Sequence, residues 1–353
     1  MKRGSFSAMT SVSNQDRSRP VGIWLFSVAI LVLAMVVVGG ATRLTGSGLS
    51  ITEWKPVTGA IPPMSPEAWM GEFERYKQIP QYVQLNKGMS LDAFKGIYWW
   101  EWSHRFLART VGAAFALPLI YFGLRRQIPR RLLLPCITLF GLGGLQGAVG
   151  WWMVSSGLDH RVSVAPERLM THLGLAMALL AALVWTGLEA WAGPAPRSAR
   201  GRWHAVSMAL LVGVYIQILL GALVAGNHAG LVYNDWPLMN GRLLPDNYFG
   251  GDLWGTLAHS LGAVQLHHRL TAYGLVIAGL VAVVQAQKSA VLSANAKRMA
   301  ILLGVALGLQ SMLGIITLVS HVPMALGMAH QVAAALVLSV VTGFLWIVRR
   351  QPG

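Results

Sequence analysis

The chain has 353 residues, of which 54% are hydrophobic and only 12% are charged. Because an average soluble domain carries about 25% charged residues, this composition excludes a disordered chain and argues against a soluble enzyme. The formal net charge of +15 would suit a nucleic-acid-binding protein, but the basic residues lie in short clusters between long apolar runs, which indicates a membrane protein without a nucleic-acid partner.

Eight apolar stretches are each long enough to cross a lipid bilayer, which takes about 20 residues. They follow a polar tail at residues 1–20 and are expected at residues 21–42, 104–124, 132–153, 169–188, 204–226, 268–287, 299–319 and 326–348. The first stretch is too long for the apolar core of a signal peptide and lacks a clear cleavage site, so we expect it to be retained. The predicted fold class is an all-α integral membrane protein with eight transmembrane helices.

The basic clusters predict the direction of the spans. Sixteen of the 28 basic residues fall in the two tails and in alternate loops, together with only two acidic residues, Asp16 and Glu189. The positive-inside rule places these segments, and so both termini, in the cytoplasm. The long loops at about residues 43–102 and 227–267 then lie outside. The start of the chain lacks a long transit peptide, so we expect a bacterial inner (plasma) membrane.

The two halves of the chain resemble each other. Four groups recur in the same order: Gly48-Leu49, Trp54, Gly59 and Pro63 as Gly230-Leu231, Trp236, Gly241 and Pro245; Glu101-xx-His104-Arg105 as Gln265-xx-His268-Arg269; Gln146-xxx-Gly150 as Gln310-xxx-Gly314; and Met170-x-His172 as Met328-x-His330. The spacing between the copies changes only at loops. This pattern predicts two parallel-repeat four-helix bundles, an N-terminal half at residues 21–195 and a C-terminal half at residues 196–353.

The repeat singles out four histidines, His104, His172, His268 and His330, each near the predicted outer start of a span. Two neutral imidazoles from facing helices are a common axial pair for haem iron inside a four-helix bundle. The alternative is a set of hydrogen-bonded core histidines, which four repeat-equivalent positions make less attractive. Zinc would lack a tetrahedral ligand set, since Cys136 is the single cysteine.

The other six histidines have weaker patterns. His267 adjoins His268 on a predicted helix, so only one of the two can face the bundle core, and the following Arg269 favours His268. The remaining five lack repeat partners, and we expect them at surfaces or in loops: His160, His204, His228, His259 and His321.

Charged residues accompany the histidines. Arg105, Arg109 and Arg269 follow them and can pair with haem propionates or extend to the membrane interface. Glu101 shares a helix face with His104, whereas its counterpart Gln265 cannot ionise. This asymmetry favours chemistry in the first half and a structural or electron-transfer haem in the second. The alternative is a salt bridge between Glu101 and Arg105.

Together these motifs closely resemble the haem A synthase family over about residues 21–348. The resemblance rests on Gly39-Gly-Ala-Thr-Arg-Leu-Thr-Gly-Ser-Gly-Leu-Ser50, Trp54-Lys-Pro-Val-Thr-Gly59, Glu101-xx-His104-Arg105, Asn234-Asp-Trp-Pro-Leu-Met239, His268-Arg269 and Met328-Ala-His330. The long first loop without a cysteine pair is similar to the proteobacterial and mitochondrial branch.

The resemblance implies oxidation of the C8 methyl of haem O to an alcohol and then to the aldehyde of haem A, for cytochrome oxidase. It implies that His104 and His172, with Arg105, hold the substrate and that Glu101 is the catalytic carboxylate. A haem b cofactor would be held by the histidine pair of the second half, His268 and His330, with Arg269.

The resemblance also implies haem O synthase and cytochrome oxidase assembly factors as partners, and a homo-oligomer is compatible with it. We expect water as the oxygen source, with Glu101 as general base. From the residues alone, two rivals stay open: a di-haem b cytochrome that only passes electrons, and a haem carrier. The asymmetry between Glu101 and Gln265 favours the enzyme.

Overall fold

The computed structural model describes the backbone of residues 4–193 and 201–351, with side chains from Ser18 onward. Within these residues, eight helices are long and apolar enough to cross a membrane, which confirms the predicted number. They are α1 (Gly4–Leu44, apolar from Ser18), α4 (Leu91–Leu124), α5 (Arg130–Ser155), α6 (Pro166–Ala192), α7 (Arg202–Gly226), α8 (Leu261–Lys288), α9 (Ala294–Val319) and α10 (Met324–Val348).

Polar caps explain where several of these helices begin. The Ser90 side chain accepts a hydrogen bond from the Ala93 backbone N–H at the start of α4, and Ser260 caps α8 at Ala263 in the same way. Such a cap satisfies one backbone N–H that the first turn leaves free. Because α4 starts at Leu91 rather than at 104, His104 lies well inside the helix, and the expectation that it begins a span is wrong.

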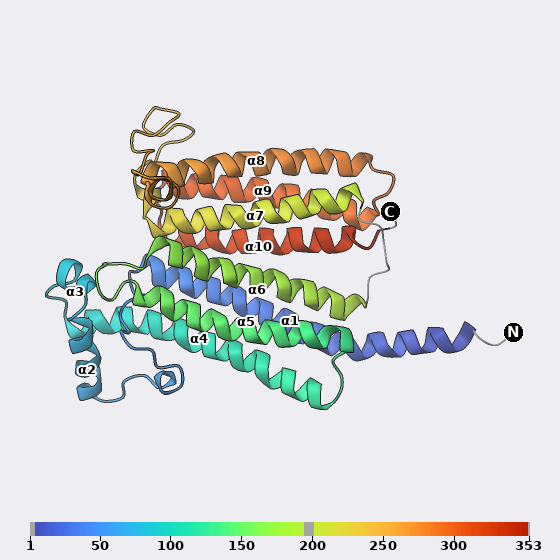
Figure 1. The fold of residues 1–353 in the computed structure, drawn as a ribbon, viewed down its shortest axis with the longest axis horizontal. Helices are drawn as coiled ribbons and strands as arrows, with labels where there is room; N and C mark the ends of the chain where they lie inside the picture. Colours follow the sequence, from blue (N-terminus) through green and yellow to red (C-terminus); the bar gives the residue numbers. More distant parts are fainter. Residues whose placement is uncertain (1–3, 194–200, 352–353) are drawn as a thin grey trace.

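The eight long helices form two groups that lie side by side (Figure 1). One group contains α1, α4, α5 and α6, and the other contains α7, α8, α9 and α10. The groups meet where α6 packs on α7 and α10, and where α1 packs on α10. The repeat relation between the halves stays a prediction.

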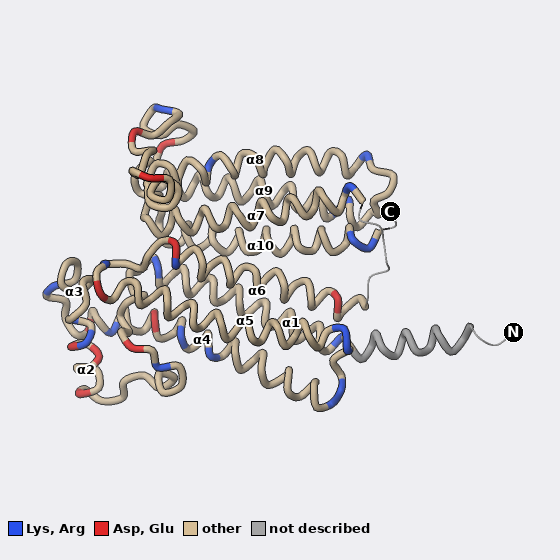
Figure 2. Tube along the Cα trace, viewed as in Figure 1, with Lys and Arg blue, Asp and Glu red and all other residues tan. Residues whose placement is uncertain are grey.

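Both long loops lie at the end of the molecule opposite to the termini (Figure 1). The first is partly helical and contains α2 (Pro66–Tyr76) and α3 (Pro80–Leu85). Phe73 and Tyr76 of α2 pack on Phe94 near the start of α4, and Tyr82 of α3 packs on the same two rings of α2. Among the described residues, most acidic positions gather at the loop end of the tube (Figure 2), whereas Glu189 lies in the last turn of α6 and pairs with Arg350.

Candidate functional site

The four predicted histidines lie toward the loop end of their helices, on α4 and α6 in one group and on α8 and α10 in the other. In the second group, the ring centroids of His268 and His330 are 6.4 Å apart, with the planes at 83°. Two imidazole nitrogens that each lie about 2 Å from a shared metal place their ring centroids about 6 Å apart. This pair therefore fits one iron between its rings.

A glycine of a neighbouring helix backs each of these rings. A Cβ atom would lie 3.2 Å from the His104 ring at Gly39, 2.9 Å from His172 at Gly150, 3.0 Å from His268 at Gly221 and 2.8 Å from His330 at Gly314. Carbon atoms in contact normally stay at about 3.5 Å or more. The rings thus lie where only glycine leaves room for them.

Three of the rings also contact a glutamine that the sequence analysis did not assign to the site. The amide nitrogens of Gln146, Gln217 and Gln310 lie 3.2, 3.0 and 3.2 Å from Nδ1 of His172, His268 and His330, in that order. Each amide nitrogen also donates to the backbone carbonyl of the same histidine at 2.9–3.0 Å. The Oε1 atom of all three amides is buried without a partner.

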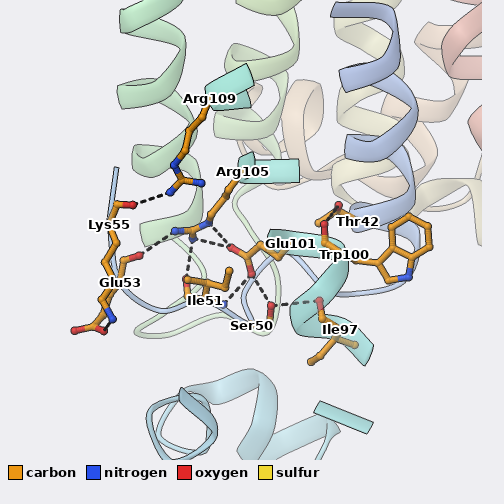
Figure 3. Close-up of polar contacts among 10 residues, drawn as sticks. All are labelled: Thr42, Ser50, Ile51, Glu53, Lys55, Ile97, Trp100, Glu101, Arg105 and Arg109. Carbon is orange, nitrogen blue, oxygen red and sulfur yellow. Dashed lines mark hydrogen bonds and ion pairs between the residues drawn. The ribbon is translucent and has the colours of Figure 1, made fainter. Parts of the chain in front are cut away.

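Glu101 is 3% exposed, and its carboxylate is fully engaged (Figure 3). Oε2 accepts hydrogen bonds from Ser50 Oγ and from the Ile51 backbone N–H, both at 2.8 Å. Oε1 accepts from Arg105 Nε at 3.1 Å and from Nη2 at 2.7 Å. The salt bridge weighed as an alternative is therefore present, and it is buried rather than exposed at the surface.

The two arginines of α4 fasten the first loop to the helix (Figure 3). Arg105 donates to the carbonyls of Ile51 at 2.8 Å and Glu53 at 2.9 Å, and Arg109 donates to the carbonyls of Lys55 and Pro56. Both side chains line a cleft of about 240 Å³ between this loop and α4. Most of their donors are thus already paired with loop carbonyls, although Nη1 of Arg109 is buried without a partner.

The second half builds the same kind of contact with the opposite polarity. Arg269 donates to the carbonyl of Tyr233 at 3.0 Å and to Gln265 Oε1 at 2.9 Å. The Gln265 amide nitrogen donates to the carbonyls of Ala229 and Tyr233. Where Glu101 accepts from the backbone of the first loop, Gln265 donates to the backbone of the second. Each residue type therefore suits the hydrogen-bonding groups that its loop presents.

Two other histidines near these sites contact different groups. His267 faces away from His268 and His330, as predicted, and its Nε2 lies 3.1 Å from the Tyr248 hydroxyl. His228, just beyond α7, lies with Nε2 2.8 Å from Arg43 Nη2. Burial lowers the pKa of His228 below its usual value, and the charge of Arg43 lowers it further. A neutral His228 accepts a hydrogen bond from Arg43 and joins the two halves there.

Comparisons with known proteins show the family to which the chain belongs. Residues 22–342 match a family described as "Cytochrome oxidase assembly protein", COX15-CtaA. The chain is similar to a heme A synthase of Caulobacter sp. (strain K31), with 62% identity over 97% of this chain and 100% of the relative. It is similar to heme A synthases of Caulobacter vibrioides, with 59% identity over the same shares, and of Bradyrhizobium diazoefficiens, with 49% identity over 94% and 92%.

Proposed function

Since the chain belongs to the COX15-CtaA family of cytochrome oxidase assembly proteins and acts as an oxidoreductase in haem A formation, we propose that it oxidises the C8 methyl of haem O to a formyl group, by way of the alcohol. With water as the oxygen source, one water is consumed, and four electrons and four protons leave for each methyl converted. The electrons pass to an external oxidised acceptor. The observation that carries the proposal is the near full-length similarity to heme A synthases.

We assign the second half to a haem b cofactor held by His268 and His330, with Arg269 fixing the loop above them. The 6.4 Å separation of the ring centroids supports this assignment. When bound between two imidazoles, haem b supplies a one-electron redox centre. The imidazoles of His268 and His330 would hold the haem iron, and the glycines behind them keep the rings in place.

We assign the first half to the substrate, held by His104 and His172 beneath the loop that Arg105 and Arg109 fasten. Glu101 is the general base in this proposal. It would take a proton from the water that attacks the oxidised carbon, and its negative charge would stabilise the positive charge that develops there. To do so it must exchange one of its present partners for water. The Ser50 hydroxyl is the most easily exchanged, because a hydroxyl rotates freely.

The asymmetry between Glu101 and Gln265 no longer separates the enzyme from a di-haem b cytochrome by itself, because the polarity of the two loops also explains it. Pigment extraction from protein purified out of membranes that make haem O separates the two functions. Haem O or haem A beside haem b is the expected result. Haem b alone, with haem O abundant in the same membranes, would contradict the proposal.

We further propose that the protein lies in the bacterial inner membrane with both termini in the cytoplasm and the histidine sites toward the outer face. Because Cys136 is buried, a single added cysteine can report the side of each loop. Lys87→Cys, in the first loop, should react with an impermeant thiol reagent in spheroplasts, while Ala290→Cys, between α8 and α9, should not. We also propose that haem O synthase supplies the haem O substrate and that cytochrome oxidase assembly factors receive the haem A product.

A further inference from the structure

The four histidine rings differ in one respect that the proposed function does not use. Three of them contact a glutamine that lies four residues before the glycine backing the ring: Gln146 before Gly150, Gln217 before Gly221, and Gln310 before Gly314. The fourth ring, His104, is backed by Gly39, and four residues before it stands Met35. Among the described residues, no side chain hydrogen-bonds to the His104 ring.

The ring of His104 is also turned differently. A Cβ atom at Gly39 would meet Nε2 of His104 first, at 3.2 Å. At the other three glycines it would meet Cε1 first, then Nδ1, with Nε2 the most distant of the three atoms, at 3.5–3.8 Å. Nε2, the nitrogen that binds haem iron in most proteins, is therefore the His104 ring atom closest to the backing helix α1. In the other three rings, Cε1 and Nδ1 lie closer to the backing helix than Nε2 does.

A glutamine beside Nδ1 matters because of the proton that iron binding requires. When Nε2 binds a metal, the neutral ring carries its proton on Nδ1, and metal-bound histidines almost always donate that proton to an acceptor. The Oε1 atoms of the three glutamines are buried acceptors without a partner. A half-turn of the amide exchanges its oxygen and nitrogen and brings Oε1 onto Nδ1. Because the amide nitrogen now lies 2.9–3.0 Å from the histidine carbonyl, the turned amide must also move away from that oxygen. The backbone carbonyl of the histidine then loses the glutamine amide as a donor, but it still accepts the helical hydrogen bond from the backbone N–H four residues later in the chain.

We propose that Gln146, Gln217 and Gln310 are positioning residues that accept the Nδ1 proton of three iron ligands, and that Met35 leaves His104 as the one ligand without such an acceptor. The bond from iron to His104 is then the one that opens when haem O enters and haem A leaves. This inference rests on the proposed function, in which the first half exchanges its haem. It explains why the departure from the pattern falls in that half.

Reciprocal substitutions test the proposal. Met35→Gln places an amide at the position that a glutamine holds in the other three sites, where it can accept from Nδ1 once the His104 ring turns to the orientation of the other three rings. Gln217→Met removes one such amide from the haem b site. Loss of a partner of this kind typically weakens metal binding by about 10–100-fold. We expect Gln217→Met to transfer haem b to excess apomyoglobin at least about tenfold faster than the wild type, and Met35→Gln to slow the transfer of haem O and haem A by a similar factor. The surface exchange Gln84→Met should change neither rate.

A redox titration separates the hydrogen bond from simple packing. An acceptor on Nδ1 makes the imidazole a stronger donor to iron, so we expect Gln217→Met to raise the midpoint potential of haem b and Gln217→Glu to lower it below the wild-type value. Glutamate fills the same space as glutamine but lowers the potential by its charge alone, so the rise expected for the uncharged variant Gln217→Met is the result that tests the hydrogen bond. Unchanged potentials and transfer rates in the Gln217 and Met35 variants would overturn the inference.

The two proposals fail in different ways. If pigment extraction yields haem b alone, the proposed function fails, while the Gln217 variants still report on the haem b site. If haem O and haem A are present but Met35→Gln releases them at the wild-type rate, the function stands and the assignment of His104 as the opening ligand is wrong.

Discussion

Replacement of Glu101 by glutamine tests both the chemistry and the architecture of the first half. The change keeps the shape of the side chain but turns one acceptor oxygen into an NH₂ donor and removes the charge. In one orientation the NH₂ group faces the Ile51 N–H, and in the other it faces the Arg105 guanidinium. Either way a buried donor loses its acceptor.

The size of the effect follows from these contacts. A buried donor left unpaired costs about 1–3 kcal/mol, more when the group is charged. Removing one member of a buried ion pair costs about 3–5 kcal/mol, but the carbonyls of Ile51 and Glu53 still hold Arg105 after the change, and its side chain is 16% exposed. We therefore expect Glu101→Gln to lower the free energy of unfolding by about 2–4 kcal/mol, and the thermal midpoint in detergent by roughly 5 °C or more.

Lost turnover alone would not prove a catalytic role, because displacement of the loop also lowers it. Gln265→Glu is the matched variant: it sets a carboxylate against the carbonyls of Ala229 and Tyr233 and destabilises the second loop without touching Glu101. Ser50→Ala removes one hydrogen bond of Glu101 and keeps its charge, at a cost of about 1 kcal/mol.

The assay is haem A formed per bound haem b in membranes that also make haem O, measured beside the thermal midpoint. If Glu101 is the base, Glu101→Gln should lose roughly 100-fold or more in turnover, far more than Gln265→Glu at a similar loss of stability. Near-wild-type haem A from Glu101→Gln would make the carboxylate structural. An unchanged thermal midpoint would refute the hydrogen-bond reasoning.

Three further predictions concern the second half. Changing His268 or His330, the proposed haem b ligands, to alanine should abolish the low-spin haem b spectrum. His267→Ala should keep that spectrum, because its ring faces Tyr248. A full haem b spectrum in both ligand variants would contradict the assignment. Gly221→Ala should distort the haem b spectrum because the new methyl lies 3.0 Å from a ligand ring, while Gly274→Ala, with open space around it, should leave the spectrum unchanged and gain up to about 1 kcal/mol of helix stability. Backbone N–H groups of residues 240 and 241 lower the pKa of Asp235, so its contribution to the order of the second loop is present at neutral pH and is lost as the pH falls below about 4. The protection of that loop against hydrogen exchange, relative to the intrinsic rate, should therefore fall there in the wild type. An equal loss of protection in Asp235→Asn would contradict this cause.

The sequence predicts the spans well because bilayer thickness sets their length and charge marks their ends. It misplaces the start of α4, because residues 91–103 carry aromatic side chains that pack under α2 and α3 and extend the helix beyond the apolar run. The repeat pattern used above does not include Gln217, although this residue stands four positions before Gly221, as Gln146 stands four positions before Gly150. That four-residue spacing is the sequence signal that identifies it.

The partners of Arg105 and Arg269 could not be predicted from the sequence. An arginine after a haem-ligand histidine suits a propionate equally well, and the choice depends on where the loop carbonyls point. The path of loop residues 51–53 sets those directions for Arg105, and the path of residues 233–238 sets them for Arg269. No local sequence pattern encodes either path. The same holds for Glu101 and Gln265. In the sequence their difference suggests a catalytic carboxylate in one half only, whereas in the structure it also matches loops that donate to Glu101 and accept from Gln265.

The two halves also share one helix at their centre. On α1, Gly39 backs His104 of the first half, and the adjacent Gly40 lies against Gln331 of α10, where a Cβ atom would come within 2.7 Å of the amide oxygen. Gln331 directly follows the proposed ligand His330. One turn later, Arg43 donates to the last carbonyls of α7. Through these contacts α1 joins the two proposed sites, so a displacement of α1 at the first site would move atoms that pack beside the second.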